Sequence, residues 1–536
     1  MATLKNLMTF SALLASATAF AETYYFTNYE RNVAGTNNSW YTSDAWTNSS
    51  GVVTANVSPK SGDTAVFSNE YLQYSGRDCV VNNGVTVKDI ILTNGFGANL
   101  AQGTSSTLTI TGDLKKLYGS GEKAGASTAT FSYSGNTSHS FDTAAKLVIG
   151  GNVEVGEVDD AGKSTINAGT LRLGSNGDLS TSWSAGLGKV TIGGDVILRY
   201  RGQLQLNSAF DYDGTSYASV KELAWAKLNA GEVTVQIGGA LLAYGGQSST
   251  DTYWTNPDLI LFSRRNTVQG GVAIIEANGI NGTFNTITTS ASCTTDSIAI
   301  LRLVNDASSN YSTSSWIYDK SGVTIPDGSY NTKMMIQMAG VGTQKLAGDR
   351  LCITGGIDIL SGTLQVNMSN ATEGMRYSRG DITLRGGKFG SLLGGEKNKG
   401  QSNMLFSDFI YTDGTWLLYT VANNIDKLTL EGSLLKGESF APDGKMKIDI
   451  SGDAAWLIDN FAQILVWDNT TKLTDFDAGE ISANTIEVDG KIYSAVFDIR
   501  DDGLWVSYTS AVPEPAAIAT LLGILALGFV AVRRRK

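Results

Sequence analysis

Histidine and cysteine are scarce in this chain, and each shortage excludes a class of protein. His139 is the only histidine among 536 residues, so catalysis by a nucleophile–histidine pair would depend on that side chain alone. The three cysteines, Cys79, Cys293 and Cys352, lie far apart and allow at most one intramolecular disulfide, which excludes a disulfide-stapled scaffold. Whether any two of them pair stays open. Their spacing fits no metal site, and we expect neither a metal nor another cofactor.

Positive charge is also in short supply. Charged residues make up 17% of the chain, and 40 Lys and Arg stand against 51 Asp and Glu, which gives a formal net charge of −11. Nucleic acids and anionic lipid surfaces are bound by clustered cations. The body of the chain has no such cluster, so we expect no nucleic-acid partner.

Turn-forming and strand-forming residues are abundant instead. The chain has 61 Gly but only 6 Pro, together with long tracts of Ser, Thr and Asn. Glycine and asparagine are typical of turns, and the apolar residues alternate with polar ones as they do in half-buried strands. We therefore predict an all-β fold.

Self-similar segments recur along the middle of the chain. In each, an apolar-x-apolar strand leads to a glycine and then to a second such strand, and in most of them the glycine is a pair. These segments cover residues 108–114, 147–155, 190–198, 233–241, 351–359 and 382–389. Strands of a second kind occur at 166–173 and 360–366. We interpret each unit as two turns of about twenty residues, with the glycine pair at a corner where a side chain would clash.

Irregular repeats of this length predict a solenoid, in which each coil buries its apolar face against its neighbours. We expect a right-handed parallel β-helix over residues 22–445. The alternative is a β-propeller, because a period near forty suits a four-stranded blade. An aromatic-rich β-region at 446–510 should close one end of the stack, and the cluster around Trp40, Tyr41 and Trp46 should cap the other.

The first 21 residues have the pattern of a secretory signal peptide. Lys5 precedes an apolar run at 7–15, and small residues follow up to Ala19 and Ala21. This pattern predicts cleavage before Glu22 by signal peptidase, after export through the secretion translocon. The alternative is a first core helix.

The segment 511–536 has three parts in a fixed order. Pro513, Glu514 and Pro515 precede an uncharged stretch at 516–532, and four cations end the chain, Arg533, Arg534, Arg535 and Lys536. As a helix, the stretch would be about 25 Å long, barely enough to cross a bilayer. The cations would stay on the cytoplasmic side. The alternative is a plain membrane anchor.

This C-terminal segment resembles a PEP-CTERM sorting signal. The resemblance implies recognition of Pro513, Glu514 and Pro515 by an exosortase, a membrane-embedded peptidase-transpeptidase. The helix would present that motif at the membrane, and the basic tail would stop transfer. The protein would then be anchored only transiently in the inner membrane.

Part of the body also resembles proteins with autotransporter-associated β-strand repeats. The resemblance is carried by residues 44–46, Pro59, 62–67, 85–92 and 361–367. It implies a β-helical, passenger-like body on the cell exterior. The chain departs from the autotransporter plan, because a Pro-Glu-Pro motif and one helix stand where a translocating barrel would be.

Candidate catalytic residues are few. His139 lies in a polar loop, and no Gly-x-Ser-x-Gly elbow accompanies any serine. The adjacent acids Asp159–Asp160 and Asp501–Asp502 would point to opposite faces of a strand, so we interpret them as solvated turn residues. Exposed Trp and Tyr side chains could stack on sugar rings. The alternative is that they pack across strands.

Together these features predict a secreted structural or adhesin-like protein of the cell surface or extracellular matrix, and not an enzyme. Extracellular polysaccharide is a candidate partner. The alternatives are a carbohydrate-active β-helix enzyme, either a lyase or a glycoside hydrolase, and a glycan-binding protein without turnover. An enzyme should bring three or more charged side chains into one groove on the long face. The ligand and the oligomeric state stay open.

Overall fold

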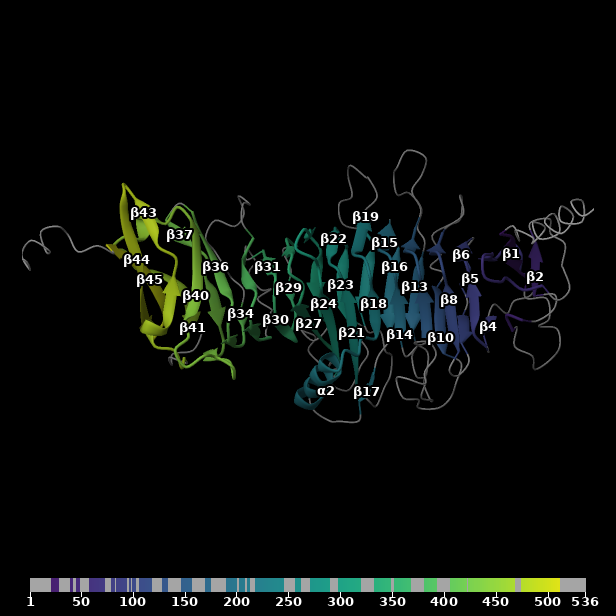
Figure 1. Cartoon of the computed structure of the whole chain (residues 1–536), viewed down its shortest axis with the longest axis horizontal. Coiled ribbons are helices and arrows are strands. Elements are labelled where there is room, and N and C mark those ends of the chain that lie inside the picture. The colour runs from purple at the N-terminus through teal and green to yellow at the C-terminus, as the bar shows by residue number, and fades with distance from the viewer. Residues whose placement is uncertain are drawn as a thin grey trace, which may run out of the picture.

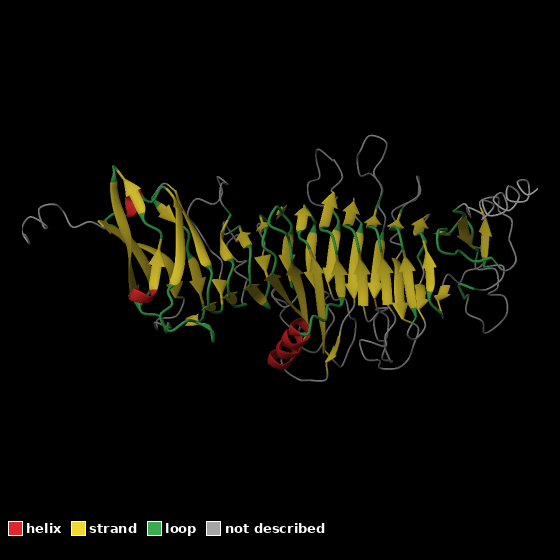
Figure 2. Ribbon diagram, viewed as in Figure 1, coloured by secondary structure: helices red, strands yellow, loops and turns green. Residues whose placement is uncertain are grey.

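The computed structural model of the chain describes residues 21–27, 39–41, 45–48, 57–72, 79–81, 83–93, 96–97, 99–102, 106–117, 128–133, 146–156, 169–174, 189–199, 202–207, 210–212, 217–244, 256–261, 270–289, 297–319, 332–348, 351–367, 380–392, 405–421, 423–467 and 474–510. Within these residues short β-strands dominate, and Figure 2 shows them as a row of arrows along the molecule. The molecule is elongated, with its N-terminal strands at one end and its C-terminal strands at the other (Figure 1).

The described strands belong to three long sheets and a smaller sheet at the C-terminal end. Sheet A contains β1 (Thr23–Phe26), β2 (Trp46–Asn48), β3 (Thr64–Ser68), β6 (Asp89–Thr93), β9 (Leu114–Lys116), β12 (Val153–Val155), β15 (Val196–Arg199), β19 (Leu241–Tyr244), β22 (Ile280–Gly282), β25 (Asn310–Thr313), β28 (Thr343–Leu346), β31 (Thr363–Val366), β33 (Lys388–Ser391), β36 (Thr415–Val421), β37 (Asn424–Ile425), β40 (Met446–Gly452) and β42 (Ile481–Ala483). Sheet B contains β4 (Cys79–Val81), β7 (Asn99–Gln102), β10 (Thr128–Tyr133), β13 (Thr170–Gly174), β16 (Gln203–Asn207), β20 (Asp258–Leu261), β23 (Thr286–Thr289), β26 (Trp316–Tyr318) and β29 (Leu351–Cys352).

Sheet C contains β5 (Val85–Val87), β8 (Thr107–Ile110), β11 (Lys146–Ile149), β14 (Lys189–Ile192), β18 (Val235–Ile237), β21 (Gly270–Ala277), β24 (Ser297–Leu303), β27 (Thr332–Met338), β30 (Gly356–Ile359), β32 (Ile382–Leu384), β35 (Phe409–Tyr411) and β39 (Leu434–Lys436), with β17 (Phe210–Tyr212) antiparallel to β21. The end sheet contains β34 (Leu405–Phe406), β38 (Leu428–Leu430), β41 (Ala462–Trp467), β43 (Ile486–Val488), β44 (Lys491–Arg500) and β45 (Gly503–Ser510). The described helices are α2 (Tyr217–Asn229) and the short 3-10 helices η2 (Ala455–Leu457) and η3 (Ala478–Glu480).

The chain passes through sheets C, A and B in turn, and one such circuit is called a coil. Each coil stacks on the one before it in parallel register, so that Leu147 pairs with Leu108 in sheet C and Val153 pairs with Leu114 in sheet A. This arrangement is compatible with the predicted β-helix solenoid. It differs from a β-propeller, whose blades are separate four-stranded sheets.

The interpretation of each repeat as two turns is wrong. Leu108 and Leu147 belong to consecutive repeats and pair directly, so one repeat makes one coil of three strands. The glycine pair at 355–356 also lies at a different corner from those at 150–151 and 193–194, because it separates β29 of sheet B from β30 of sheet C. The strands at 170–174 and 363–366 likewise belong to different sheets, B and A.

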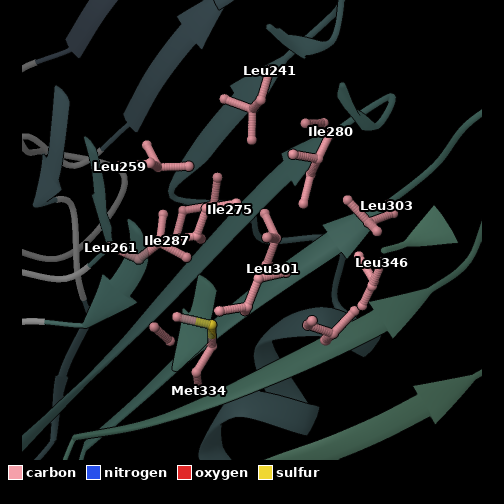
Figure 3. Packing of buried hydrophobic residues seen from close by; sticks show 14 of the residues in the cluster. Leu241, Leu259, Leu261, Ile275, Ile280, Ile287, Leu301, Leu303, Met334 and Leu346 are labelled. Atoms are coloured by element: carbon pink, nitrogen blue, oxygen red, sulfur yellow. The ribbon is translucent and has the colours of Figure 1, made fainter. Parts of the chain in front are cut away.

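Alternating strands bury one apolar column from each sheet along a common core. The strands β8, β11 and β14 each show the same alternation of half-buried and buried residues. Figure 3 shows Leu241 and Ile280 of sheet A, Leu259 and Ile287 of sheet B and Leu301 of sheet C pointing toward one another. All are fully buried in one continuous cluster. Burial of that kind is the main favourable term in folding.

Glycine pairs allow the coils to stack closely at the corner between sheets C and A. A Cβ atom added to Gly151, Gly194 or Gly239 would overlap a side-chain oxygen of the preceding coil. These three oxygens belong to Asp113, Asn152 and Asp195. The corner therefore needs glycine because the neighbouring coil occupies the space, as the sequence predicted.

Those same side chains form a ladder along the corner. Asp89 Oδ1 accepts a hydrogen bond from Asp113 N at 2.9 Å, and Asp113 Oδ1 accepts one from Asn152 N at 2.8 Å. Asn152 Oδ1 then accepts from Asp195 N, and Asp195 Oδ1 from Ala240 N, each at 2.8 Å. Each acceptor lies one coil before its donor. The ladder therefore fixes the register of four successive coil contacts, at about 1 kcal/mol or more per bond.

Both ends of the stack are closed by antiparallel strands and aromatic packing. At the N-terminal end β2 pairs antiparallel with β1, and the buried rings of Trp40 and Trp46 lie 4.8 Å apart with Phe26 and Phe67 beside them. Tyr41, expected in this cluster, is 47% exposed. At the other end the hairpin of β44 and β45 pairs antiparallel with β41. These pairings cover edges that would otherwise be open to further strands.

Candidate functional site

Most residues that the sequence singled out lie outside the described residues. These are Ala19, His139, Asp159, Asp160, Cys293, Pro513, Glu514, Pro515, Arg533, Arg534 and Arg535. Ala21 is described and exposed, two residues before β1. Among the described helices, none is long and apolar enough to cross a membrane. The C-terminal helix predicted for residues 516–532 falls outside that part of the chain and stays a prediction.

Asp501 and Asp502 occupy the exposed turn between β44 and β45. Trp505 Nε1 donates to Asp502 Oδ1 at 2.9 Å, and Gln463 Nε2 donates to the Asp502 carbonyl at 2.8 Å. The pair was interpreted as turn acids, and both residues do lie in a turn. Asp502 also holds the hairpin against β41.

A groove lies on the outer face of sheet C, where α2 covers part of the sheet. Residues 217–229 form a helix because the stretch has no glycine or proline, contains good helix formers and places Val220, Ala224 and Leu228 four residues apart. These three side chains pack on buried residues of β21 and β24, among them Ile274 and Ile300. Figure 1 shows α2 projecting from the side of the stack at these strands.

Beyond the end of that contact the sheet face is open. The groove has a volume of about 450 Å³, within the range of small-molecule sites. Its lining comprises Lys221, Trp225, Met335, Gly355, Ile357, Asp358, Asp381, Thr383, Arg385, Ile410, Thr412, Gly437, Glu438 and Ser439. The helix supplies one wall, the turn after β39 supplies the other, and β30, β32 and β35 supply the floor.

A buried carboxylate anchors the floor. Asp358 is 1% exposed, and its Oδ1 accepts a hydrogen bond from Arg385 Nε at 2.9 Å. Its Oδ2 accepts from Gln337 Nε2 at 2.8 Å. The Arg385 guanidinium lies over the Trp225 ring, 5.4 Å from its centroid. A buried charge requires such partners, and the arrangement fixes the Trp225 ring beside a planar cation.

An ion pair connects the helix to the floor. Lys221 Nζ lies 3.5 Å from Asp381 Oδ2, and both side chains are about one-third exposed. A pair of this kind contributes little to stability, on the order of 0–1 kcal/mol. Its effect is mainly to position the Lys221 and Trp225 wall against β32.

A row of polar side chains continues from the groove along sheet C. Gln236, Glu276, Arg302, Gln337 and Asp358 are paired in sequence across neighbouring strands. Arg302 Nη1 lies 3.6 Å from Glu276 Oε2. Two atoms in the middle of the row, Arg302 Nε and Gln337 Oε1, are buried and have no hydrogen-bond partner within the described part of the chain. The row reaches the groove at Asp358, and the two atoms belong to the strands before it, β24 and β27.

The sequence did not reveal this site. Its charged residues come from positions between 221 and 438 and meet only because coils stack. Pairing Asp358 with Thr383 and Thr383 with Ile410 requires the true strand register. The one available signal was the glycine-free stretch at 217–229, which stands out in a glycine-rich chain.

The strongest shifts of side-chain pKa lie in the two end caps, away from the groove. Burial raises the pKa of Tyr508 to about 12, and the negative charge of Asp449 adds to the shift. Burial and a hydrogen bond to Glu22 raise the pKa of Tyr24 far above its usual range. In the described residues no group of three or more His, Cys, Asp and Glu side chains could hold a metal ion.

Comparison with known families gives no match to any family model. No curated protein matches the chain either.

Proposed function

We propose that this chain is a secreted bacterial surface protein, a right-handed β-helical rod with a structural or adhesive role outside the cell. Its C-terminal segment would be recognised by an exosortase-type membrane peptidase through Pro513, Glu514 and Pro515. The protein would end at the cell surface or in the extracellular matrix after transient anchoring in the inner membrane.

The observation that supports this role best is the continuous core along three parallel sheets. Each coil contacts mainly its neighbours, so length is gained without a larger domain. Both ends are covered by antiparallel strands and buried aromatic rings. Such a rod suits display of a surface at a distance from the membrane, and the net charge of −11 keeps it soluble.

The termini of the protein recovered from its own cells test the proposal. We expect intact mass measurement to show a chain that starts at Glu22 and lacks Arg533–Arg535 and Lys536. Replacing Glu514 with Gln should leave the tail attached, whereas Glu438→Gln, in the turn after β39, should be processed normally. A protein that keeps both termini and stays in the cytosol contradicts the proposal.

The groove supports a second candidate, glycan binding. Its lining includes five charged residues, Lys221, Asp358, Asp381, Arg385 and Glu438, which is the convergence expected of a carbohydrate-active β-helix enzyme. However, Asp358 is paired with Arg385 and Asp381 with Lys221. Carboxylates held in this way favour recognition over proton transfer. Release of reducing ends from a bound polysaccharide would instead favour the enzyme.

A further inference from the structure

We infer that the groove between α2 and the outer face of sheet C binds a neutral saccharide, with one sugar ring against Trp225. The inference deepens the proposed adhesive role by naming a ligand class and a site. It depends on three features of the groove, namely its charge, its mixture of apolar and hydroxyl groups and its backbone, and on an unfilled acceptor on the neighbouring strand β27.

Charge in the groove is nearly balanced. Lys221 pairs with Asp381, and Arg385 pairs with the buried Asp358, so the two cations are already matched. Glu438 stands exposed at the rim and adds one negative charge. An anionic polymer would approach a protein of net charge −11 and find no unmatched cation among the described residues that line the groove. An uncharged ligand avoids this electrostatic repulsion.

The lining matches the two faces of a sugar ring. Trp225, Met335 and Ile410 present apolar surface on the helix side and the floor. The hydroxyl groups of Thr383 and Thr412 lie on the floor among them. A pyranose has apolar C–H faces and a rim of hydroxyls, so it can stack on an aromatic ring while its hydroxyls bond to planar and hydroxyl side chains.

The backbone of the floor argues against an extended peptide. Peptides that add to a sheet do so at an open edge, through main-chain hydrogen bonds. Here the ligand would lie on the face of sheet C, where β30, β32 and β35 are already paired with one another. These strands offer the ligand no open edge, which favours a molecule that binds through side chains, such as one rich in hydroxyl groups.

An acceptor on β27, the strand next to the floor, lacks a donor among the described residues. Gln337 is 2% exposed, and its Nε2 is used by Asp358, while its Oε1 has no partner among the described residues. Buried polar atoms are rarely left unpaired. A hydroxyl that reached this row directly or through a water would satisfy the atom.

Binding of the purified full chain to a panel of neutral polysaccharides, namely glucans, mannan, galactan and xylan, tests the inference by affinity electrophoresis. We expect at least one polymer to retard the protein. Trp225→Ala should weaken that interaction about tenfold or more, equivalent to about 1.4 kcal/mol. Thr383→Val, which keeps the shape of the floor, should weaken it severalfold.

Tyr244→Ala is the matched control. Like the partly buried Trp225, Tyr244 has an arginine against its ring, since Arg199 lies 5.1 Å from its centroid. It is 47% exposed and lies on sheet A outside the groove. Its loss should leave binding unchanged. Trp225→Phe keeps a ring and should retain most of the affinity, which separates stacking from damage to α2.

Absence of binding to every neutral polymer overturns the inference. The inference is also wrong if the Trp225→Ala and Thr383→Val proteins bind as tightly as the unchanged protein. Binding only to anionic polymers or to peptides overturns it as well. These outcomes are independent of the terminal processing, because the assay uses purified protein. If the chain is sorted correctly but binds no neutral polymer, the proposed surface location holds and the proposed saccharide site is wrong.

Discussion

Replacing Gly194 with alanine should weaken the stack at one corner. A methyl group there would overlap Asn152 Oδ1 and lie 2.9 Å from the Gly151 carbonyl oxygen. Asn152 Oδ1 accepts the hydrogen bond from Asp195 N that joins the two coils. Overpacking of this kind costs about 1–3 kcal/mol, and loss of the bond costs about 1 kcal/mol more. We expect the free energy of unfolding to fall by about 2–4 kcal/mol.

The Gly194→Ala protein should lose stability both locally, around the corner, and in the chain as a whole. In a solenoid each coil depends on its neighbours, so unfolding of so long a chain need not be two-state. Native-state hydrogen exchange should therefore show faster exchange at Asp195 N, and urea unfolding followed by circular dichroism should show a lower midpoint. Gly479→Ala is the control, because its Cβ would meet no atom within 4 Å. Its effect should stay within about 0.5 kcal/mol.

A double-mutant cycle isolates the cause. Asn152→Ala removes the side chain that the methyl group would strike, so the two changes together should cost less than their sum by about 0.5–1.5 kcal/mol. An additive cycle, or a Gly194→Ala protein as stable as the Gly479→Ala protein, would refute the explanation given for the glycine pairs.

Two further predictions concern buried polar groups. Because the pKa of Tyr508 is raised to about 12 in the folded chain from about 10, the folded state holds that proton more tightly, and stability should fall as pH rises from about 10 to 12. Tyr508→Phe should reduce the loss of stability between pH 9 and pH 11 by about 1.3 kcal/mol in urea unfolding, and an unchanged loss would contradict this origin. Asp319 is fully buried and its Oδ2 accepts hydrogen bonds from Met334 N at 2.9 Å and Thr354 N at 2.6 Å. Asp319→Ala should lower the free energy of unfolding by about 2–4 kcal/mol, and Asp319→Asn should lower it less. An equal fall in both variants would show that the negative charge of Asp319 matters more than its hydrogen bonds.

The β-rich architecture follows from the sequence because period-two alternation states directly which side chains face the core. Leu108 and Ile110 are buried, and Thr109 between them is only half-buried. The Trp40 and Trp46 cluster could be predicted for a similar reason, since rings of that size require burial in a cap.

The number of strands in a coil could not be obtained in the same way. Connections between sheets vary in length, so a repeat of about forty residues is equally consistent with two short turns or one long coil. A glycine pair alone does not identify its corner either. Gly355 and Gly386 follow similar strands, yet the first precedes a strand of sheet C and the second a strand of sheet A. Only the strand register distinguishes the two corners, and that register is set when the coils stack.

The groove was beyond sequence reasoning for a related cause. Trp225 and Arg385 are far apart in the sequence. They meet because α2 extends along the outside of coils that follow it in the chain. Nothing in the spacing of Asp358 and Arg385 marks them as partners.

The side-chain hydrogen bonds of the corner ladder all run the same way along the chain. Asp113 presents its acceptor to Asn152, and Asn152 presents its own to Asp195, always from an earlier coil to a later one. The earlier coil emerges first, whether from a ribosome or from the translocon proposed above, so its acceptor is already in place when the next coil appears. Folding can thus advance coil by coil as the polypeptide emerges. A duplicated coil would meet the same row of side-chain acceptors on the coil before it. Lengthening by duplication is therefore open to this protein at little structural cost.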